Sequence, residues 1–453
     1  AEITGGSISG DVTCERYLPS SNQAGWRILG SPISGVTLAA WNDDFLTSGF
    51  IGSNDPSFSW ISLYSYNETM AGDADAVGWE APASITDPIN VGEGYEAYIH
   101  NVDTTIDVTG TLNTGDISLN VSYTNSGSAT DDGWTLVANP YMSSIDWDDA
   151  DWVKTKMNDA VFIWDHINGV NASYVGGVAN NGGGPLIASS QGFAVQANDV
   201  SPVLTAKEGV KSSTDHTFWR KEAIDVLRLE LEGAGYRDQT TIAFNTNASI
   251  AFEEDKDARK FNNMFPAPNF ASTNGTDDFS INSLSFDEDM VIPLKTLINT
   301  SGVYSINVVD ISDSINCVML YDRYLDVSIN LSIDSNYVFT IDDTTQSPRF
   351  EISFCEQTFG SLHENQATSE ILNVYPNPTT GEFVMVLNNY SVQEIEIRVV
   401  NSFGQIVISD RLDVKKGTQT IELNLGNFSK GMYFIQTFND EGIFSSMKMV
   451  KSD

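Results

Sequence analysis

Short apolar runs alternate with polar residues along most of the chain, and turn-forming residues separate the runs. Examples are WTLVANP, VLRLELEG, YSINVVD, YVFTID and RFEISF. β-branched and aromatic residues with a period of two are typical of half-buried strands. The pattern predicts an all-β chain built from tandem β-sandwich-like domains.

One segment, DWDDADWVKTKMNDA at residues 146–160, has helical features instead. Asp146 is a suitable N-cap, and the acidic residues after it favour the positive end of a helix dipole. The sequence therefore predicts one helix here.

An internal repeat relates the first hundred residues to the second hundred. Three short motifs return in order: GWRIL at 25–29 as GWTLV at 133–137, GDVT at 10–13 as GDIS at 115–118, and GYEAY at 94–98 as GFAVQ at 192–196. The offsets are 108, 105 and 98 residues, so loop lengths differ while the order of strands is kept. We expect two related β units.

The domain boundaries follow from this repeat and from changes in pattern. A stretch without apolar periodicity precedes the last strands and is expected to be a linker. The last segment alternates about seven short strands with turns, which fits a small Ig-like β-sandwich. The predicted parts are repeat copy 1 at 1–105, repeat copy 2 at 106–205, a β-sandwich at 206–356, a linker at 357–370 and the C-terminal domain at 371–453.

Charge narrows the classes of partner. The 453 residues include 61 acidic and 23 basic ones, a formal net charge of −38. Such a surface repels phosphate backbones, so we expect no nucleic-acid partner. No stretch approaches the ~18 apolar residues of a transmembrane helix, so none is expected. The chain starts at Ala1, which is consistent with trimming after a signal peptide.

Candidate chemistry is sparse. The three cysteines, Cys14, Cys317 and Cys355, are too few for a disulfide scaffold or a zinc module, although a Cys317–Cys355 bridge is compatible with an oxidising exterior. The four histidines fall in no metal-binding or catalytic spacing, and phosphate loops and nucleophile elbows are absent from the sequence. We therefore predict no catalytic residues, no metal ligands and no cofactor, but a pair of carboxylates brought together by folding leaves glycosidase chemistry open.

Clustered acidic residues also leave a structural calcium ion open. The clusters are Asp73 with Asp75, Asp148 with Asp149 and Asp151, Glu253 to Asp257, and Asp287 to Asp289. None of them completes an EF-hand loop, and solvated acidic loops are the alternative interpretation.

Eight of the nine tryptophans lie in the repeat region. Trp26 and Trp134 precede alternating apolar residues, so we expect them in the two cores. Four others stand among polar residues and are candidates either for glycan contact or for the core: Trp41, Trp60, Trp79 and Trp147.

The C-terminal segment carries several spaced motifs. They are VYPNPTTGEF, an NSFGQ turn, FSKGMYF and a last strand with SMKMVK. In this order they resemble the type A C-terminal sorting domain of type IX secretion cargo in Bacteroidetes. The matching positions are Pro376, Asn377, Pro378, Gly381, Gly404, Gly431, Tyr433 and Lys448.

The resemblance implies export through the periplasm to the cell surface or medium. It further implies binding to the type IX translocon and an outer-membrane shuttle barrel, and cleavage by a sortase near the linker at 355–370. The preceding part is interpreted as a non-catalytic adhesin or gliding accessory that binds polysaccharide or another surface component. The alternative is a secreted carbohydrate-active enzyme.

Overall fold

The regular secondary structure of the described residues is almost entirely β-strand, as the sequence predicts. A computed structural model describes residues 8–19, 23–70, 78–100, 102–213, 224–287, 289–312, 314–315, 317–341, 348–354, 369–389, 393–401, 405–415, 417–439 and 442–452. They form two compact units, residues 1–318 with 331–354, and residues 319–330 with 355–453. Within the described ranges, no helix has the length and apolar character needed to cross a membrane.

Two sheets and one short helix form repeat copy 1. The sheets have the orders β1–β7–β3 and β2–β6–β4–β5. Their inner faces share one apolar core, which includes Ile33, Leu63 and Ile99. The elements are β1 (Val12–Leu18), β2 (Gly25–Leu29), β3 (Ile33–Ser34), α1 (Ala39–Asn42), β4 (Leu63–Tyr66), β5 (Trp79–Glu80), β6 (Tyr95–Ile99) and β7 (Thr104–Leu112).

Three sheets form repeat copy 2, with the orders β11–β17–β8, β15–β10–β18 and β14–β13–β12–β16–β9. They enclose a second core, which includes Val137, Phe193 and Leu204. The elements are β8 (Ile117–Leu119), β9 (Trp134–Ala138), β10 (Ser144–Asp146), β11 (Trp152–Thr155), β12 (Val161–Asp165), β13 (Val170–Val175), β14 (Val178–Asn180), β15 (Leu186–Ile187), β16 (Gly192–Gln196), β17 (Val203–Ala206), the 3-10 turn η1 (Glu208–Val210) and β18 (Lys211–Ser212).

The repeat seen in the sequence is reproduced in the strand pairing. In copy 1, β2 pairs with β6 so that Trp26 lies opposite Tyr98. In copy 2, β9 pairs with β16 so that Trp134 lies opposite Gln196. Tyr98 and Gln196 are equivalent positions of the repeat, so both copies use one register.

A second pair of strands repeats in the same way. Thr13 of β1 lies opposite Thr109 of β7, and Ser118 of β8 lies opposite Thr205 of β17. Each pair joins its side-chain hydroxyls, at 2.7 and 3.1 Å. Because β7 completes the sheet of copy 1, that copy extends to Leu112 in the structure and crosses the boundary expected at residues 105 and 106.

The remaining strands of the first unit form one long sheet. Its order is β29–β24–β22–β23–β20–β19–β25–β28, with β21 beside β23 and with β20 and β23 parallel. β26 and β27 pair with each other as a hairpin. The strands from residue 225 to residue 354 are β19 (Asp225–Gly233), β20 (Tyr236–Phe244), β21 (Ala258–Arg259), β22 (Asn269–Thr273), β23 (Asp278–Leu284), β24 (Val291–Leu297), β25 (Gly302–Ile311), β26 (Val318–Asp322), β27 (Val327–Asn330), β28 (Asn336–Ile341) and β29 (Phe350–Phe354), of which β27 and most of β26 belong to the second unit.

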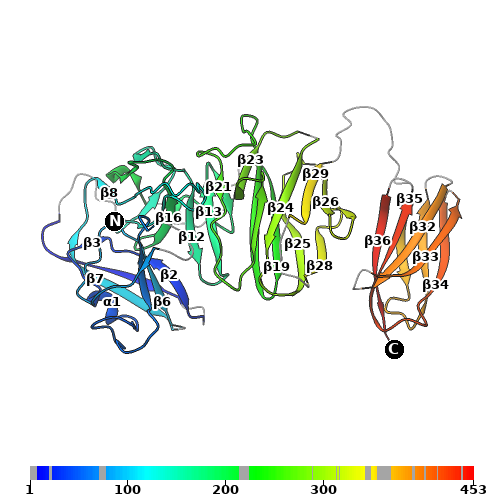
Figure 1. Cartoon of the computed structure of the whole chain (residues 1–453), viewed down its shortest axis with the longest axis horizontal. Helices are drawn as coiled ribbons and strands as arrows, with labels where there is room; N and C mark the ends of the chain where they lie inside the picture. The colour runs from blue at the N-terminus through cyan, green and yellow to red at the C-terminus, as the bar shows by residue number, and fades with distance from the viewer. Residues whose placement is uncertain are drawn as a thin grey trace. The chain divides into compact units, whose positions relative to one another are not determined.

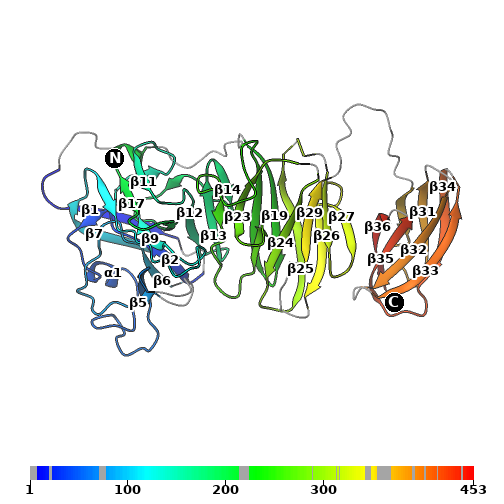
Figure 2. The same cartoon turned by 45° about the horizontal axis from the view of Figure 1, so that its top comes forward.

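A third apolar core joins the two copies to this long sheet. It combines Ile28 of β2, Trp134 of β9, Phe162 of β12 and Val226 of β19. In Figures 1 and 2, β2, β12, β13 and β19 accordingly follow one another through the first unit. Residues from both repeat copies and from the long sheet thus share one core within the first unit.

The helix predicted at residues 146–160 is wrong. This segment forms the end of β10, a turn and β11. The Asp146 carboxylate accepts the Asp148 N–H at 3.0 Å, and the Asp149 carboxylate accepts the Asp151 N–H at 2.8 Å. These local bonds satisfy the backbone outside a helix, which is why aspartate favours turns as well as N-caps.

The second unit contains a two-sheet sandwich of seven strands. The sheets have the orders β30–β31–β34 and β33–β32–β35–β36. Its core includes Phe383, Met385, Ile397 and Ile435. The strands are β30 (Ser369–Tyr375), β31 (Glu382–Asn389), β32 (Gln393–Asn401), β33 (Ile406–Val414), β34 (Gly417–Asn424), β35 (Gly431–Asn439) and β36 (Gly442–Lys451).

Candidate functional site

Two of the four tryptophans considered for glycan contact lie in the cores. Trp41 is 1% exposed and meets the Tyr95 ring edge-on at 5.6 Å. Trp147 is 0% exposed and meets Phe193 edge-on at 5.9 Å. Tyr95 and Phe193 are equivalent repeat positions, so each tryptophan fills the same place in its copy. Trp41 and Trp147 therefore cannot offer a ring face to a ligand. Their interpretation as glycan contacts is wrong, and both are core residues.

Trp60 belongs to an exposed aromatic cluster on the outer face of the β2–β6–β4–β5 sheet. Its side chain is 39% exposed, and its ring lies 5.4 Å from Trp26 and 4.7 Å from Tyr98. Tyr64 lies 5.8 Å from Trp26. We call these four residues, Trp26, Trp60, Tyr64 and Tyr98, the aromatic patch.

Trp26 and Trp79 lie between surface and core. Trp26 is only half-buried, whereas the sequence predicts a core position. Trp79 is also half-buried, packs edge-on against Tyr66 at 5.1 Å and borders the core that contains Trp134. Trp79 thus lies between the aromatic patch, where its ring is 6.4 Å from Tyr64, and the core that contains Trp134.

A buried carboxyl group lies on the same face of the sheet as the patch. Glu96 is 6% exposed and stands opposite Ile28 on one neighbouring strand and Tyr64 on the other. Burial raises its pKa to about 8. Sequence reasoning missed Glu96, because it falls where strand alternation places an outward-facing residue.

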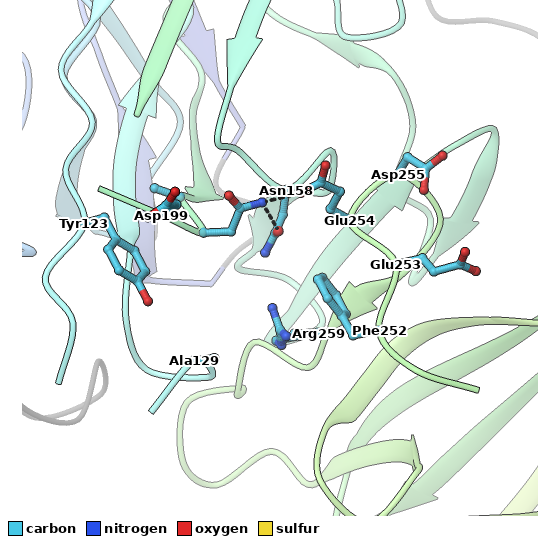
Figure 3. A pocket seen from close by; sticks show the side chains of 11 residues that line it. Tyr123, Ala129, Asn158, Asp199, Phe252, Glu253, Glu254, Asp255 and Arg259 are labelled. Carbon is cyan, nitrogen blue, oxygen red and sulfur yellow. Dashed lines mark hydrogen bonds between the residues drawn. The ribbon is translucent and has the colours of Figure 1, made fainter. Parts of the chain in front are cut away.

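A cavity of about 630 Å³ lies elsewhere in the first unit (Figure 3). Tyr123 and Asn158 of copy 2 and Phe252 and Glu254 of the loop between β20 and β21 contribute to its lining. The side-chain amide of Asn198 donates one hydrogen bond to the side-chain oxygen of Asn158 at 3.0 Å and another to the Glu254 carboxylate at 2.6 Å. Both are drawn as dashed lines in Figure 3. Sequence reasoning identified only the acidic run at 253–257.

Most ionised groups at the cavity are paired. Asp199 lies 3.2 Å from Lys156, and Glu253 lies 2.9 Å from Lys256. The hydrogen bond from the Val200 N–H, together with Lys156, lowers the pKa of Asp199. A hydrogen bond from Lys256 lowers the pKa of Glu253.

Arg259 is the cationic residue in the cavity lining. Its Nε donates to Asp277 at 2.8 Å, and its guanidinium lies 3.5 Å above the Phe252 ring. Its charge is therefore neutralised by Asp277 and covered by an aromatic face. The cavity as a whole keeps an acidic character.

Carboxyl groups with raised pKa values lie away from the lining of this cavity. Burial raises the pKa of Asp44 and of Asp257 to about 6, and it also raises the pKa of Asp146. Asp257 accepts the backbone N–H groups of Glu253 and Ser283, so its carboxylate fixes the loop. A glycosidase general acid would need a raised pKa at the reacting bond.

The acidic clusters considered for calcium are engaged with the protein or fall outside the described residues. Asp148 accepts a hydrogen bond from the Tyr174 hydroxyl, and the Asp287 carboxylate accepts the Asp289 N–H at 3.0 Å. Asp73 and Asp75 lie outside the described residues. Across the part of the chain that the structure describes, no three acidic, histidine or cysteine side chains converge on one point.

Two of the three cysteines can be placed. Cys14 is a free and buried thiol, and Cys317 is disulfide-bonded. Cys355 lies outside the described residues.

The motif at the start of the second unit joins its first and last strands. The Asn377 amide donates to the Lys448 carbonyl at 2.9 Å and accepts the Val450 N–H at 2.9 Å. The Thr379 N–H donates to the Val450 carbonyl at 2.8 Å. The segment around Pro376 and Pro378 is thus tied to β36 before the chain enters β31.

Other matched positions have structural roles. A Cβ on Gly381, whose φ is +151°, would come within 3.0 Å of the Gly426 backbone. Tyr433 is buried, and its hydroxyl donates to the Ser429 carbonyl at 2.5 Å. Gly431, which opens β35, has φ +154°. Gly404 lies outside the described residues.

The structure singles out Lys451 rather than Lys448 as the anchoring lysine. Lys448 is exposed, whereas the buried Lys451 ammonium donates to the carbonyls of Leu425, Gly426 and Phe428 at 3.0, 3.2 and 2.5 Å. Sequence reasoning missed Lys451, because two lysines close together in an alternating strand differ only in the face they occupy.

Comparison with known proteins gives two family matches. Residues 4–354 match the family described as Domain of unknown function (DUF8693). Residues 373–452 match the Secretion system C-terminal sorting domain. The second match confirms the resemblance found in the C-terminal motifs.

Individual relatives are more distant. Ulvan lyase NLR42 of Nonlabens ulvanivorans is 33% identical over 97 residues, which is 21% of this chain and 17% of that protein. Dimeric latent PorU of Porphyromonas gingivalis is 12% identical over 55% of this chain and 31% of its own, with a TM-score of 0.17. The BSP domain of a biofilm-associated protein is 9% identical over 100% of both chains, with a TM-score of 0.14. These TM-scores are too low to establish a shared fold.

The two family matches together identify the families to which the two parts of the chain belong. A type IX sorting domain marks cargo that is exported to the cell surface or the extracellular space. The chain belongs to the DUF8693 family over residues 4–354, and it continues into the sorting domain of a type IX secretion cargo protein at residues 373–452.

Proposed function

We propose that the part of the chain before the sorting domain is a non-catalytic surface protein, an adhesin or a gliding accessory, that binds glycan at the aromatic patch. The observation that supports this most is the exposed ring of Trp60, which contacts the half-buried rings of Trp26 and Tyr98. An apolar ring face with a polar edge complements the C–H face of a sugar ring.

Charge favours a neutral glycan over an anionic one. The formal net charge of −38 repels sulfated or uronic-acid polymers over most of the surface. Stacking on aromatic rings needs no opposite charge, so neutral polysaccharide is the favoured ligand class.

The carboxyl groups support binding rather than catalysis. Around the cavity, Asp199 and Glu253 have lowered pKa values, so both are ionised at neutral pH and neither is poised to donate a proton. At the aromatic patch, the neighbouring carboxyl group with a raised pKa, Glu96, is buried beneath the rings and hydroxyls that reach the surface.

A carbohydrate-active enzyme is the second candidate. The name of the ulvan lyase relative favours it, although the similarity covers 17% of that protein. Incubation with algal and bacterial polysaccharides separates the two candidates, because a lyase or hydrolase releases new chain ends and a binding protein does not.

The finer partners of export are also proposals. We expect the sorting domain to dock on the translocon and an outer-membrane shuttle barrel, and a sortase to cleave near residues 355–370. Deletion of residues 371–453 should retain the protein inside the cell. Normal appearance at the exterior would contradict this role.

A glycan array tests the patch directly. We expect the full chain to bind neutral polysaccharide and the Trp60→Ala variant to lose about tenfold in affinity, since one stacked aromatic contributes on the order of 1 kcal/mol or more. Phe265→Ala is the matched control, because Phe265 is an exposed aromatic outside the patch. Equal binding by both variants, or binding by neither the wild type nor the control, would refute the proposal.

A further inference from the structure

We infer that the cavity lined by Tyr123, Phe252 and Glu254 binds a small saccharide that carries a free ammonium group, an amino sugar. This site is distinct from the aromatic patch and does not depend on the proposed function. The cavity combines a concave shape, the aromatic ring of Tyr123, the amides of Asn158 and Asn198, and more acidic than basic side chains.

The size and lining of the cavity suit a small polar ligand. Its volume of about 630 Å³ falls within the range of typical ligand pockets. Tyr123 supplies apolar surface for the face of a sugar ring, and Asn158 and Asn198 supply polar atoms beside it, while one face of the Phe252 ring is already covered by Arg259. Such a mixture of ring faces and amides matches a polyhydroxylated ring better than a purely apolar molecule.

The ionised side chains at the cavity favour a positively charged ligand. The carboxylates at the cavity are Asp199, Glu253, Glu254 and Asp255, and those of Asp132 and Glu68 also act electrostatically on Tyr123. The cations are Lys156, Lys256 and Arg259, and Arg259 is already held by Asp277. Acidic groups therefore outnumber basic ones, and an anionic ligand would be repelled.

Glu254 is the carboxylate best placed for the ammonium. One of its oxygens accepts the Asn198 amide at 2.6 Å, and it forms no ion pair within the described residues. Asp255 follows it, and its nearest cation, Lys256, lies 3.9 Å away. A ligand ammonium between these two carboxylates would supply the missing counter-charge through charge-assisted hydrogen bonds.

Calorimetric titration of the full chain with two matched disaccharides tests the site. The probes are the disaccharide of glucosamine and the disaccharide of N-acetylglucosamine, which share their rings but differ in charge. At about pH 6, where a primary amine is protonated, we expect the amine form to bind at least about tenfold more tightly. Raising the pH to about 9 should abolish this preference. Equal binding of the two sugars, or binding of neither, would overturn the inference.

Two substitutions locate the ligand. Glu254→Gln removes the charge but keeps an oxygen that can accept the Asn198 bond, so the loop stays in place, and it should weaken binding about tenfold. Asp255→Asn, at an exposed side chain, should weaken it about threefold. Glu232→Gln, an exposed charge loss on β19, is the control and should have no effect. Unchanged binding by Glu254→Gln would refute the site. Trp60→Ala should bind the amine sugar normally. This variant therefore tests the cavity independently of the proposed glycan binding at the aromatic patch.

Discussion

Trp26 and Trp134 occupy equivalent positions of the repeat but have different surroundings. Trp134 is 3% exposed, and its ring lies 4.6 Å from Phe261 of the segment that follows copy 2. Trp26 is half-buried, and its ring lies 5.4 Å from the exposed Trp60. One repeat position thus serves as an internal packing surface in copy 2 and as part of an open aromatic surface in copy 1.

This difference predicts unequal effects on stability. Trp134→Ala should lower the free energy of unfolding by about 3–5 kcal/mol, because it removes a fully buried aromatic side chain. Trp26→Ala should cost about half as much, since part of its surface is already in water. Urea unfolding followed by fluorescence measures both. Equal losses would mean that Trp26 is packed as tightly as Trp134.

Glu96 predicts a dependence of stability on pH. Its pKa is about 8 in the folded chain, whereas an unfolded glutamate titrates near about 4.3. Between these values the folded state holds a proton that the unfolded state has released, so the contribution of Glu96 to stability should fall as pH rises from about 4 to about 8, by up to about 5 kcal/mol.

Glu96→Gln should remove this fall, because the amide cannot ionise. Urea unfolding at a series of pH values compares it with the wild type and with Glu80→Gln, a control at an exposed glutamate of β5 in the same sheet. If wild type and Glu96→Gln showed the same slope, Glu96 would not be the group responsible.

Lys451 predicts a specific defect in the sorting domain. Lys451→Met should destabilise that domain by about 2–3 kcal/mol, since three buried carbonyls lose a charged donor. Limited proteolysis of the full chain should then cut the second unit earlier, and a smaller fraction of the protein should reach the cell surface or medium.

Lys448→Met is the matched control, because Lys448 is exposed on the same strand. It should leave both proteolysis and export unchanged. A stronger export defect in Lys448→Met than in Lys451→Met would show that the exporter reads the exposed lysine and that the internal anchor is secondary.

Local pattern determined the fold class, the repeat and the sorting domain. Strand alternation and turn residues act over a few positions, so they can be read directly from GWRIL and GWTLV or from VYPNPTTGEF. The same local chemistry misled at residues 146–160, where aspartates that could cap a helix instead close turns.

Tertiary structure alone decided which aromatic rings face water and which polar groups meet. Trp41, Trp60 and Trp147 stand in similar polar stretches, yet only Trp60 is exposed, because burial depends on which sheet or loop covers each face. The cavity unites Tyr123, Asn198 and Glu254 from distant parts of the chain. Such contacts arise from packing between strands far apart in sequence, and no short-range periodicity records them.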